Sequence, residues 1–287
     1  MRALVLSGGG PLAVAWESGL VAGLAAQGVT LAQADVTIGT SAGAIVGAQL
    51  ASGREPMAIA EAIFEERSRK PPPGAMGRHS PEVLSRLPSL FQLAHGGTGD
   101  ATQARAEVGA YALAAPTESE EAWVGRMELV LHGAEWAERT FYCVAVNATD
   151  GSIAMLGRDC GAPLARAVAA SCSLPGVSPP VQIGPRRFID GGFASTANAD
   201  LAKDCETVLV IAFHPAGPAA ERIMTRLESQ LVVLRAPGAE VLVLTPDVAC
   251  LDAIGSRMMD MHGRPQVAEA GLTQGRAAAA SVAEFWS

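Results

Sequence analysis

The stretch Gly39-Thr40-Ser41-Ala42-Gly43 constrains the fold of this 287-residue chain more than any other. It follows a short apolar run, Val36–Ile38, and leads into a segment of small and apolar residues. This order predicts a strand, a sharp turn and a helix. A serine on so tight a turn is lifted clear of the sheet, and the helix beneath it points backbone N–H groups at the same spot. Gly39 and Gly43 avoid the collision that side chains there would make with neighbouring backbone. By itself, the pattern also fits a Gly/Ser-rich turn that caps a helix.

A second glycine-rich turn follows the apolar run Ala3–Leu6 and precedes a helical pattern. Three consecutive glycines, Gly8, Gly9 and Gly10, stand in it. A phosphate-binding loop of the form G-x-x-x-x-G-K-[ST] is absent, and a dinucleotide fingerprint would need a third glycine where Ala13 stands. The remaining interpretation is a row of free backbone N–H groups at a helix N-terminus, arranged to hold an oxyanion.

An acid and two glycines, Asp190-Gly191-Gly192, follow a predicted strand at Arg187–Ile189. The glycines let the backbone turn away, which leaves the carboxylate of Asp190 pointing into a cleft. The alternative is an aspartate that closes a surface turn, because D-G is among the commonest turn dipeptides.

Apolar strand runs alternate with helical segments along most of the chain. Further strands are expected at 140–146, 152–156, 181–183, 206–213 and 240–244. We therefore expect an α/β fold, a three-layer sandwich with a central, mostly parallel sheet and helices on both faces. No repeat or long linker divides the sequence, so we expect a single domain over residues 1–287. Residues 70–135 read as a helical insertion, either a lid over an apolar cleft or an ordinary peripheral addition.

Composition excludes several classes of function. The net charge of −8 argues against a nucleic-acid binder and allows at most transient contact with a membrane surface. No stretch reads as a signal peptide or a membrane span, so we expect a cytoplasmic protein. The histidines show no metal-ligand spacing, and we expect neither a metal nor a cofactor. The cysteines are scattered and read as reduced thiols, and they are Cys143, Cys160, Cys172, Cys205 and Cys250.

Taken in order, the glycine loop, G-T-S-A-G and D-G-G resemble the motifs of the patatin-like phospholipase family. The stretches 169–176 and 188–192 also resemble the family's approach to its acid, and the resemblance covers about residues 1–55 and 160–200. It implies that Ser41 is a nucleophile and Asp190 its only partner, a dyad without histidine. It further implies an oxyanion hole made by the amides of Gly8, Gly9 and Gly10, and an acyl-enzyme formed from a phospholipid, lysophospholipid or acylglycerol.

The chain departs from the family's loop, G-G-G-x-[RK]-G, at two positions, which hold Leu12 and Ala13. Without the basic side chain, the resemblance favours ester hydrolysis over phospholipid as the particular substrate. One alternative is a histidine-dependent α/β-hydrolase, since His214 and His262 follow Asp190 in the order that such enzymes use. Another is a non-catalytic lipid- or nucleotide-binding protein.

Overall fold

The computed structural model describes residues 1–67, 81–96, 99–256 and 258–286. One sheet runs through it in the order β5-β6-β3-β2-β1-β7-β8, and β4 also pairs with β3. Neighbours from β8 through β7, β1 and β2 to β3 are parallel, whereas β4, β5 and β6 are antiparallel additions. The strands are β1 (Arg2–Leu6), β2 (Val36–Thr40), β3 (Thr140–Asn147), β4 (Ile153–Leu156), β5 (Val181–Ile183), β6 (Arg186–Asp190), β7 (Thr207–Ile211) and β8 (Glu240–Leu244).

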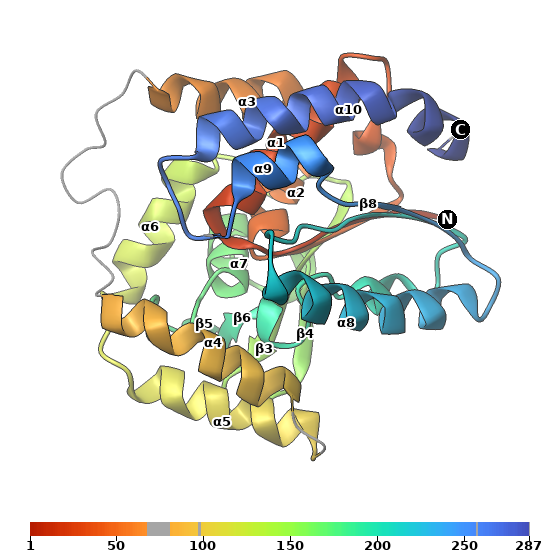
Figure 1. The fold of residues 1–287 in the computed structure, drawn as a ribbon. Helices are drawn as coiled ribbons and strands as arrows, with labels where there is room; N and C mark the ends of the chain where they lie inside the picture. Colours follow the sequence, from red (N-terminus) through yellow and green to blue (C-terminus); the bar gives the residue numbers. More distant parts are fainter. Residues whose placement is uncertain (68–80, 97–98, 257, 287) are drawn as a thin grey trace.

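Helices cover both faces of this sheet, and the predicted three-layer α/β fold is confirmed. The helices are α1 (Gly10–Ala25), α2 (Ala42–Ala51), α3 (Pro56–Phe64), α4 (Pro81–Gly96), α5 (Ala101–Ala114), α6 (Glu120–Val130), α7 (Leu164–Ser171), α8 (Pro218–Arg235), α9 (Val248–Ile254) and α10 (Arg264–Trp286). Leu4 and Leu6 of β1 pack with α1, α2, α3, α9 and α10, and the alternate residues Ala3 and Val5 pack with α8. Figure 1 accordingly places α1, α3 and α10 above the sheet and α8 below it.

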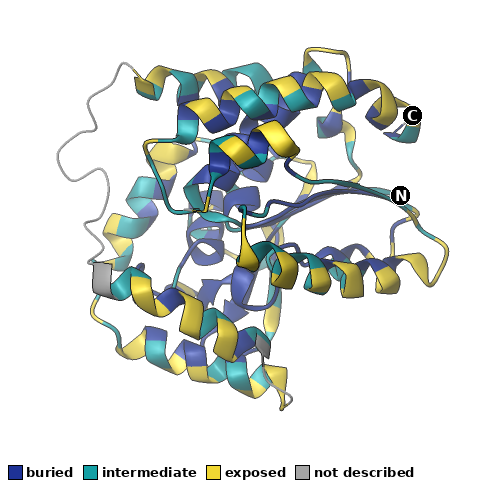
Figure 2. Ribbon diagram, in the orientation of Figure 1, coloured by how far each residue is buried: buried dark blue, intermediate teal, exposed yellow. Residues whose placement is uncertain are grey.

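The central strands β1, β2, β3 and β7 are mostly buried between these layers, and exposed residues lie on the outer sides of the helices (Figure 2). Such burial on both faces explains why the strands read as continuous apolar runs rather than as alternating ones. None of the described helices combines the length and apolar character that crossing a lipid bilayer requires.

Glycines allow α1 and α10 to pack unusually closely. Gly19 and Gly23 on α1 face Gly271 and Gly275 on α10. A Cβ atom added at Gly19 would lie 2.0 Å from the carbonyl oxygen of Ala268, so no side chain fits there. Some of the 31 glycines of the chain thus serve close contact between helices. Because α1 begins at the glycine loop, the same contact fixes the loop to the C-terminal helix.

The register of β3 explains how the serine and aspartate motifs meet. Thr40, the last residue of β2, pairs with Val144, and Asp190, the last residue of β6, pairs with Ala145. Along β3, β2 pairs with residues 140–144 and β6 with residues 145–147. Because β4 pairs with residues 143–146 from the other side, β2 and β6 lie one after the other along the same edge of β3. Residues 41 and 190, which are 149 positions apart in the chain, therefore become neighbours.

Part of the predicted insertion at 70–135, namely residues 70–80 and 97–98, lies outside the described residues. The remainder forms α4, α5 and α6. The helix α4 runs through Pro88. Burial of Leu87 and Ala94 stabilises the helix, and the ring of Phe91 stacks on Phe193 with centroids 4.3 Å apart. The helix thereby covers the segment that follows Asp190.

Candidate active site

Ser41 occupies a strained turn between β2 and α2. Its φ of 51° and ψ of −110° are sparsely populated by residues other than glycine, and such strain persists only where the surroundings enforce it. A Cβ atom at Gly39 would lie 2.5 Å from the carbonyl oxygen of Gly43, and one at Gly43 would lie 2.1 Å from that of Leu6. The backbone N–H of Ser41 donates to Ser171 Oγ at 2.9 Å. The sequence-predicted turn and the reason for its glycines are confirmed.

The hydroxyl of Ser41 donates a hydrogen bond to Asp190 Oδ2 at 2.8 Å. The other carboxyl oxygen, Oδ1, accepts the backbone N–H of Gly192 at 2.7 Å. Asp190 is 1% exposed, and burial raises its pKa to about 7, although both hydrogen bonds act in the opposite direction. A carboxyl with this pKa can accept and return a proton near neutral pH.

The turn after Asp190 is held by contacts that the sequence did not reveal. A Cβ atom at Gly191 would lie 2.3 Å from the carbonyl oxygen of Val144, which explains the first glycine of the motif. Asn198 Nδ2 donates to Thr40 Oγ1 at 3.0 Å and to the carbonyl oxygen of Gly191 at 3.3 Å. Asn198 therefore joins the serine turn to the acid motif. No motif in the sequence points to this residue, because its role depends on the fold.

The glycine loop lies against the serine. A Cβ atom at Gly8 would be 3.2 Å from Ser41 Cβ. The N–H of Gly8 is engaged, since it donates to the carbonyl oxygen of Thr196 at 2.7 Å. No acceptor for the N–H groups of Gly9 and Gly10 occurs among the hydrogen bonds of the described residues. Both groups stand at the N-terminus of α1, where the helix dipole favours negative charge.

Leu12 and Ala13 are buried in the core, where neither position could present a basic side chain to a substrate. The C-terminal region closes over this part of the loop. The carbonyl oxygen of Met258 accepts the N–H of Leu12 at 3.4 Å, and a Cβ atom at Gly10 would lie 2.9 Å from Met259 Sδ. Sequence reasoning did not connect the segment before α10 with the site.

The histidine-dependent alternative finds no support in the geometry. The acceptor of the Ser41 proton is Asp190 itself, and His214 Nδ1 contacts the carbonyl oxygen of Pro215. All five cysteines are free thiols. In the described ranges, no group of three or more His, Cys, Asp or Glu side chains is arranged to hold a metal ion.

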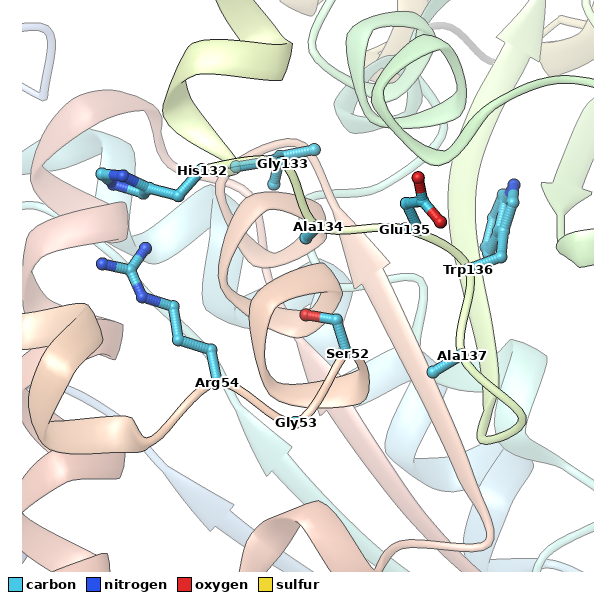
Figure 3. Close-up of a pocket in the computed structure, with 10 residues that line it drawn as sticks. Ser52, Gly53, Arg54, His132, Gly133, Ala134, Glu135, Trp136 and Ala137 are labelled. Carbon is cyan, nitrogen blue, oxygen red and sulfur yellow. The ribbon is translucent and has the colours of Figure 1, made fainter.

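An open pocket of about 660 Å³ lies beside the C-terminal end of α2 (Figure 3). Ser41 precedes the other end of this helix. Its lining residues come from the α2–α3 turn and from the segment after α6, and they are Ser52, Gly53, Arg54, Leu131, His132, Gly133, Ala134, Glu135, Trp136 and Ala137. None of the candidate catalytic residues is among them. The Arg54 guanidinium donates to Gln49 Oε1 and to the carbonyl oxygen of Ala58. The pocket is therefore separate from the chemistry at Ser41.

A serine on a sharp turn between strand and helix of a layered α/β sheet is the arrangement of an ester hydrolase. The model of the family described as patatin-like phospholipase matches residues 4–203. This is more than half of the chain, which therefore belongs to the patatin-like phospholipase family and is a lipid ester hydrolase. No curated protein sequence matches the chain significantly.

Two solved structures are similar in overall form. VipD from Legionella pneumophila has 13% sequence identity and a TM-score of 0.48, with 98% of this chain and 67% of that chain covered. The type III effector protein ExoU has 17% identity and a TM-score of 0.40, with 97% and 53% covered. The chain thus spans about two thirds of the length of VipD and about half that of ExoU.

Proposed function

We propose that this protein hydrolyses carboxylic esters of lipids with Ser41 as nucleophile and Asp190 as the only base. The hydrogen bond of 2.8 Å between Ser41 Oγ and Asp190 Oδ2 carries this proposal. A serine hydroxyl is a poor nucleophile until a positioned base accepts its proton. Asp190 can be that base because burial raises its pKa to about 7.

The reaction proceeds in two half-reactions. Ser41 Oγ attacks the ester carbonyl carbon while its proton moves to Asp190 Oδ2. The N–H groups of Gly9 and Gly10 donate hydrogen bonds to the tetrahedral oxyanion, and each such donor contributes roughly 3–4 kcal/mol in other hydrolases. The intermediate collapses to the acyl-enzyme as Asp190 gives the proton to the leaving alcohol. Water then attacks the acyl-enzyme with the same base, and the free acid leaves.

The oxyanion hole of this mechanism has fewer backbone donors than the sequence alone indicates. The N–H of Gly8 already donates to the carbonyl oxygen of Thr196, so it is not an oxyanion donor. The role expected of Gly8 is to let the loop backbone approach Ser41 closely. Gly9 and Gly10 remain as the donors. Leu12 and Ala13 offer no cation, so a phosphate head group would have to be bound elsewhere or left in solvent. Acylglycerols, lysophospholipids and phospholipids therefore all remain candidate substrates.

A fluorophosphonate probe and an ester panel test the proposal together. We expect the probe to label Ser41 in the native protein and to leave the Ser41→Ala variant unlabelled. Phospholipid, lysophospholipid, acylglycerol and short acyl esters, tested on both proteins, would define the substrate class. A folded native protein that is neither labelled nor active on any of these esters would exclude the proposed chemistry and favour a non-catalytic lipid-binding role.

A further inference from the structure

A buried carboxyl group that the proposed mechanism does not use lies behind the glycine loop. Glu17 stands on α1 and is 0% exposed. Within the described part of the chain, neither of its carboxyl oxygens has a hydrogen-bond partner. An unpaired carboxylate is very costly to bury, whereas the neutral acid is much less so. Burial accordingly raises the pKa of Glu17 well above its usual range, which favours the protonated form.

Ser7 lies next to this carboxyl. The N–H and the hydroxyl of Ser7 lower the pKa of Glu17, but burial raises it by more. The hydroxyl of Ser7 already has two neighbours. It accepts the backbone N–H of Phe213 at 2.7 Å and lies 3.3 Å from the carbonyl oxygen of Gly8, to which it donates. A hydroxyl oxygen can accept two hydrogen bonds, so Ser7 Oγ keeps one acceptor position.

We propose that Glu17 is a positioning residue of the oxyanion hole, whose protonated carboxyl donates to Ser7 Oγ, which in turn donates to the carbonyl oxygen of Gly8. That carbonyl belongs to the same peptide group as the N–H of Gly9. The chain of donors therefore ends on a peptide whose other end faces the oxyanion. Hydrogen bonds in series polarise one another, so this chain strengthens the Gly9 donor and fixes the plane of its peptide.

Ser7 also connects the loop to the nucleophile. Its carbonyl oxygen accepts the N–H of Gly43 at 2.9 Å, and its N–H donates to the carbonyl oxygen of Ile211 at 3.1 Å. The residue is thus the point at which the loop, the serine helix and β7 are joined. A hydrogen bond from Glu17 to Ser7 Oγ therefore controls the position of the loop relative to Ser41. The inference rests on the proposed function, because it assigns Glu17 a role through Gly9.

Ser18, the next residue along α1, provides a matched control. It is also 0% exposed, but its hydroxyl donates to the carbonyl oxygen of Val14, within its own helix, at 2.6 Å. Its polar group is therefore satisfied without reaching the loop. Substitution of Ser18 disturbs the same helix and tests how far a local packing change alone affects catalysis.

The experiment measures kcat and KM for a short-chain p-nitrophenyl ester with native protein and the variants Glu17→Leu, Glu17→Gln and Ser18→Ala. Weakening one oxyanion donor should cost less than removing it, so we expect kcat of Glu17→Leu to fall about tenfold with KM little changed. Glu17→Gln, whose amide can still donate to Ser7 Oγ, should restore kcat to near the native value. Ser18→Ala should keep the native kcat.

Two further measurements keep the inference testable if Glu17→Leu does not fold. Ser7→Ala interrupts the same chain and should lower kcat with KM little changed. The infrared band of a protonated carboxylic acid at neutral pH should be weaker in Glu17→Gln than in the native protein. A native kcat in folded Glu17→Leu or Ser7→Ala, or an unchanged infrared band in Glu17→Gln, would overturn the inference about Glu17. If the native protein still hydrolysed the ester, the proposed function would stand. A native protein without activity or probe labelling would overturn both.

Discussion

In the proposed mechanism, two halves of the site act on Ser41 by different means. On one side, the chemistry belongs to two side chains, Ser41 and Asp190, whose polar atoms have defined hydrogen-bond partners. On the other, it belongs to the backbone of the loop Gly8–Gly10, which has no side chains. A substitution can remove a side-chain function outright, whereas it can only displace a backbone donor. The dyad should therefore respond to mutation in an all-or-none way, and the loop should respond in proportion to its displacement.

The largest effect is expected in the dyad. Asp190→Asn should lower kcat about 10⁴-fold, as similar changes do in other serine hydrolases, because an amide cannot accept the serine proton. Its Oδ1 can still accept the N–H of Gly192, so circular dichroism should show a native fold. His214→Ala is the control and should stay close to native activity. Loss of turnover in folded His214→Ala, with activity retained in Asp190→Asn, would point to a histidine-dependent enzyme instead.

A smaller effect is expected in the loop. In Gly9→Ala, the new Cβ atom would lie 2.2 Å from Phe213 Cδ1 and 2.8 Å from Ala13 Cβ, so the loop must shift. Displacing the N–H of Gly9 should lower kcat about 10²- to 10³-fold, the range measured when one oxyanion donor is lost. The measurement is steady-state hydrolysis of a short acyl ester, with thermal unfolding as the check on folding.

Gly125→Ala on α6 is the matched control for this change, since nothing lies within 4 Å of a Cβ atom at that position. It should leave kcat unchanged. If folded Gly9→Ala also retained the native kcat, the loop would not be the oxyanion hole, and the contrast between the two halves of the site would fail.

The two halves also differ in how far the sequence predicts them. A Cβ atom at Gly39, Gly43 or Gly191 would lie 2.1–2.5 Å from a backbone oxygen, so each of these positions requires glycine. These requirements are visible in the sequence as the motifs G-x-S-x-G and D-G-G. The apolar strand runs predict the layered fold, and the resemblance of those motifs to the patatin-like family implies the dyad. The pairing of Asp190 with Ala145, one residue beyond the partner of Thr40, then brings the motifs together.

What could not be predicted depends on contacts between distant segments. Ser171, Thr196 and Asn198 acquire their roles only when β2, β3 and the turn after β6 are assembled. Glu17 reads in the sequence as one polar residue in an apolar helix, and only its burial beside Ser7 distinguishes it. The continuity of α4 also depends on contacts between distant segments. Tertiary packing around Phe91 outweighs the local cost of Pro88, which sequence pattern cannot weigh.

The smallest and most specific effect concerns pH, and it separates the dyad from the loop because only the dyad titrates near neutrality. Asp190 must be ionised to accept the serine proton, and burial raises its pKa to about 7. We therefore expect kcat/KM to rise about tenfold per pH unit below pH 7 and to level off above it. Gly9→Ala should lower the whole profile without moving its inflection, because the loop contains no titrating group.

Stability should change with pH in the opposite direction to activity. The unfolded chain releases this proton near pH 3.8, whereas the folded protein retains it up to about pH 7. Since the folded state binds more protons across this window, the free energy of unfolding of the native protein should fall between about pH 4 and pH 7. Asp190→Asn lacks this loss, which amounts to about 4 kcal/mol when converted from the pKa difference. Urea unfolding of both proteins at pH 5 and pH 8 measures the part of this loss that falls above pH 5, about 3 kcal/mol. An equal difference between the two proteins at both pH values would show that Asp190 is not a buried base.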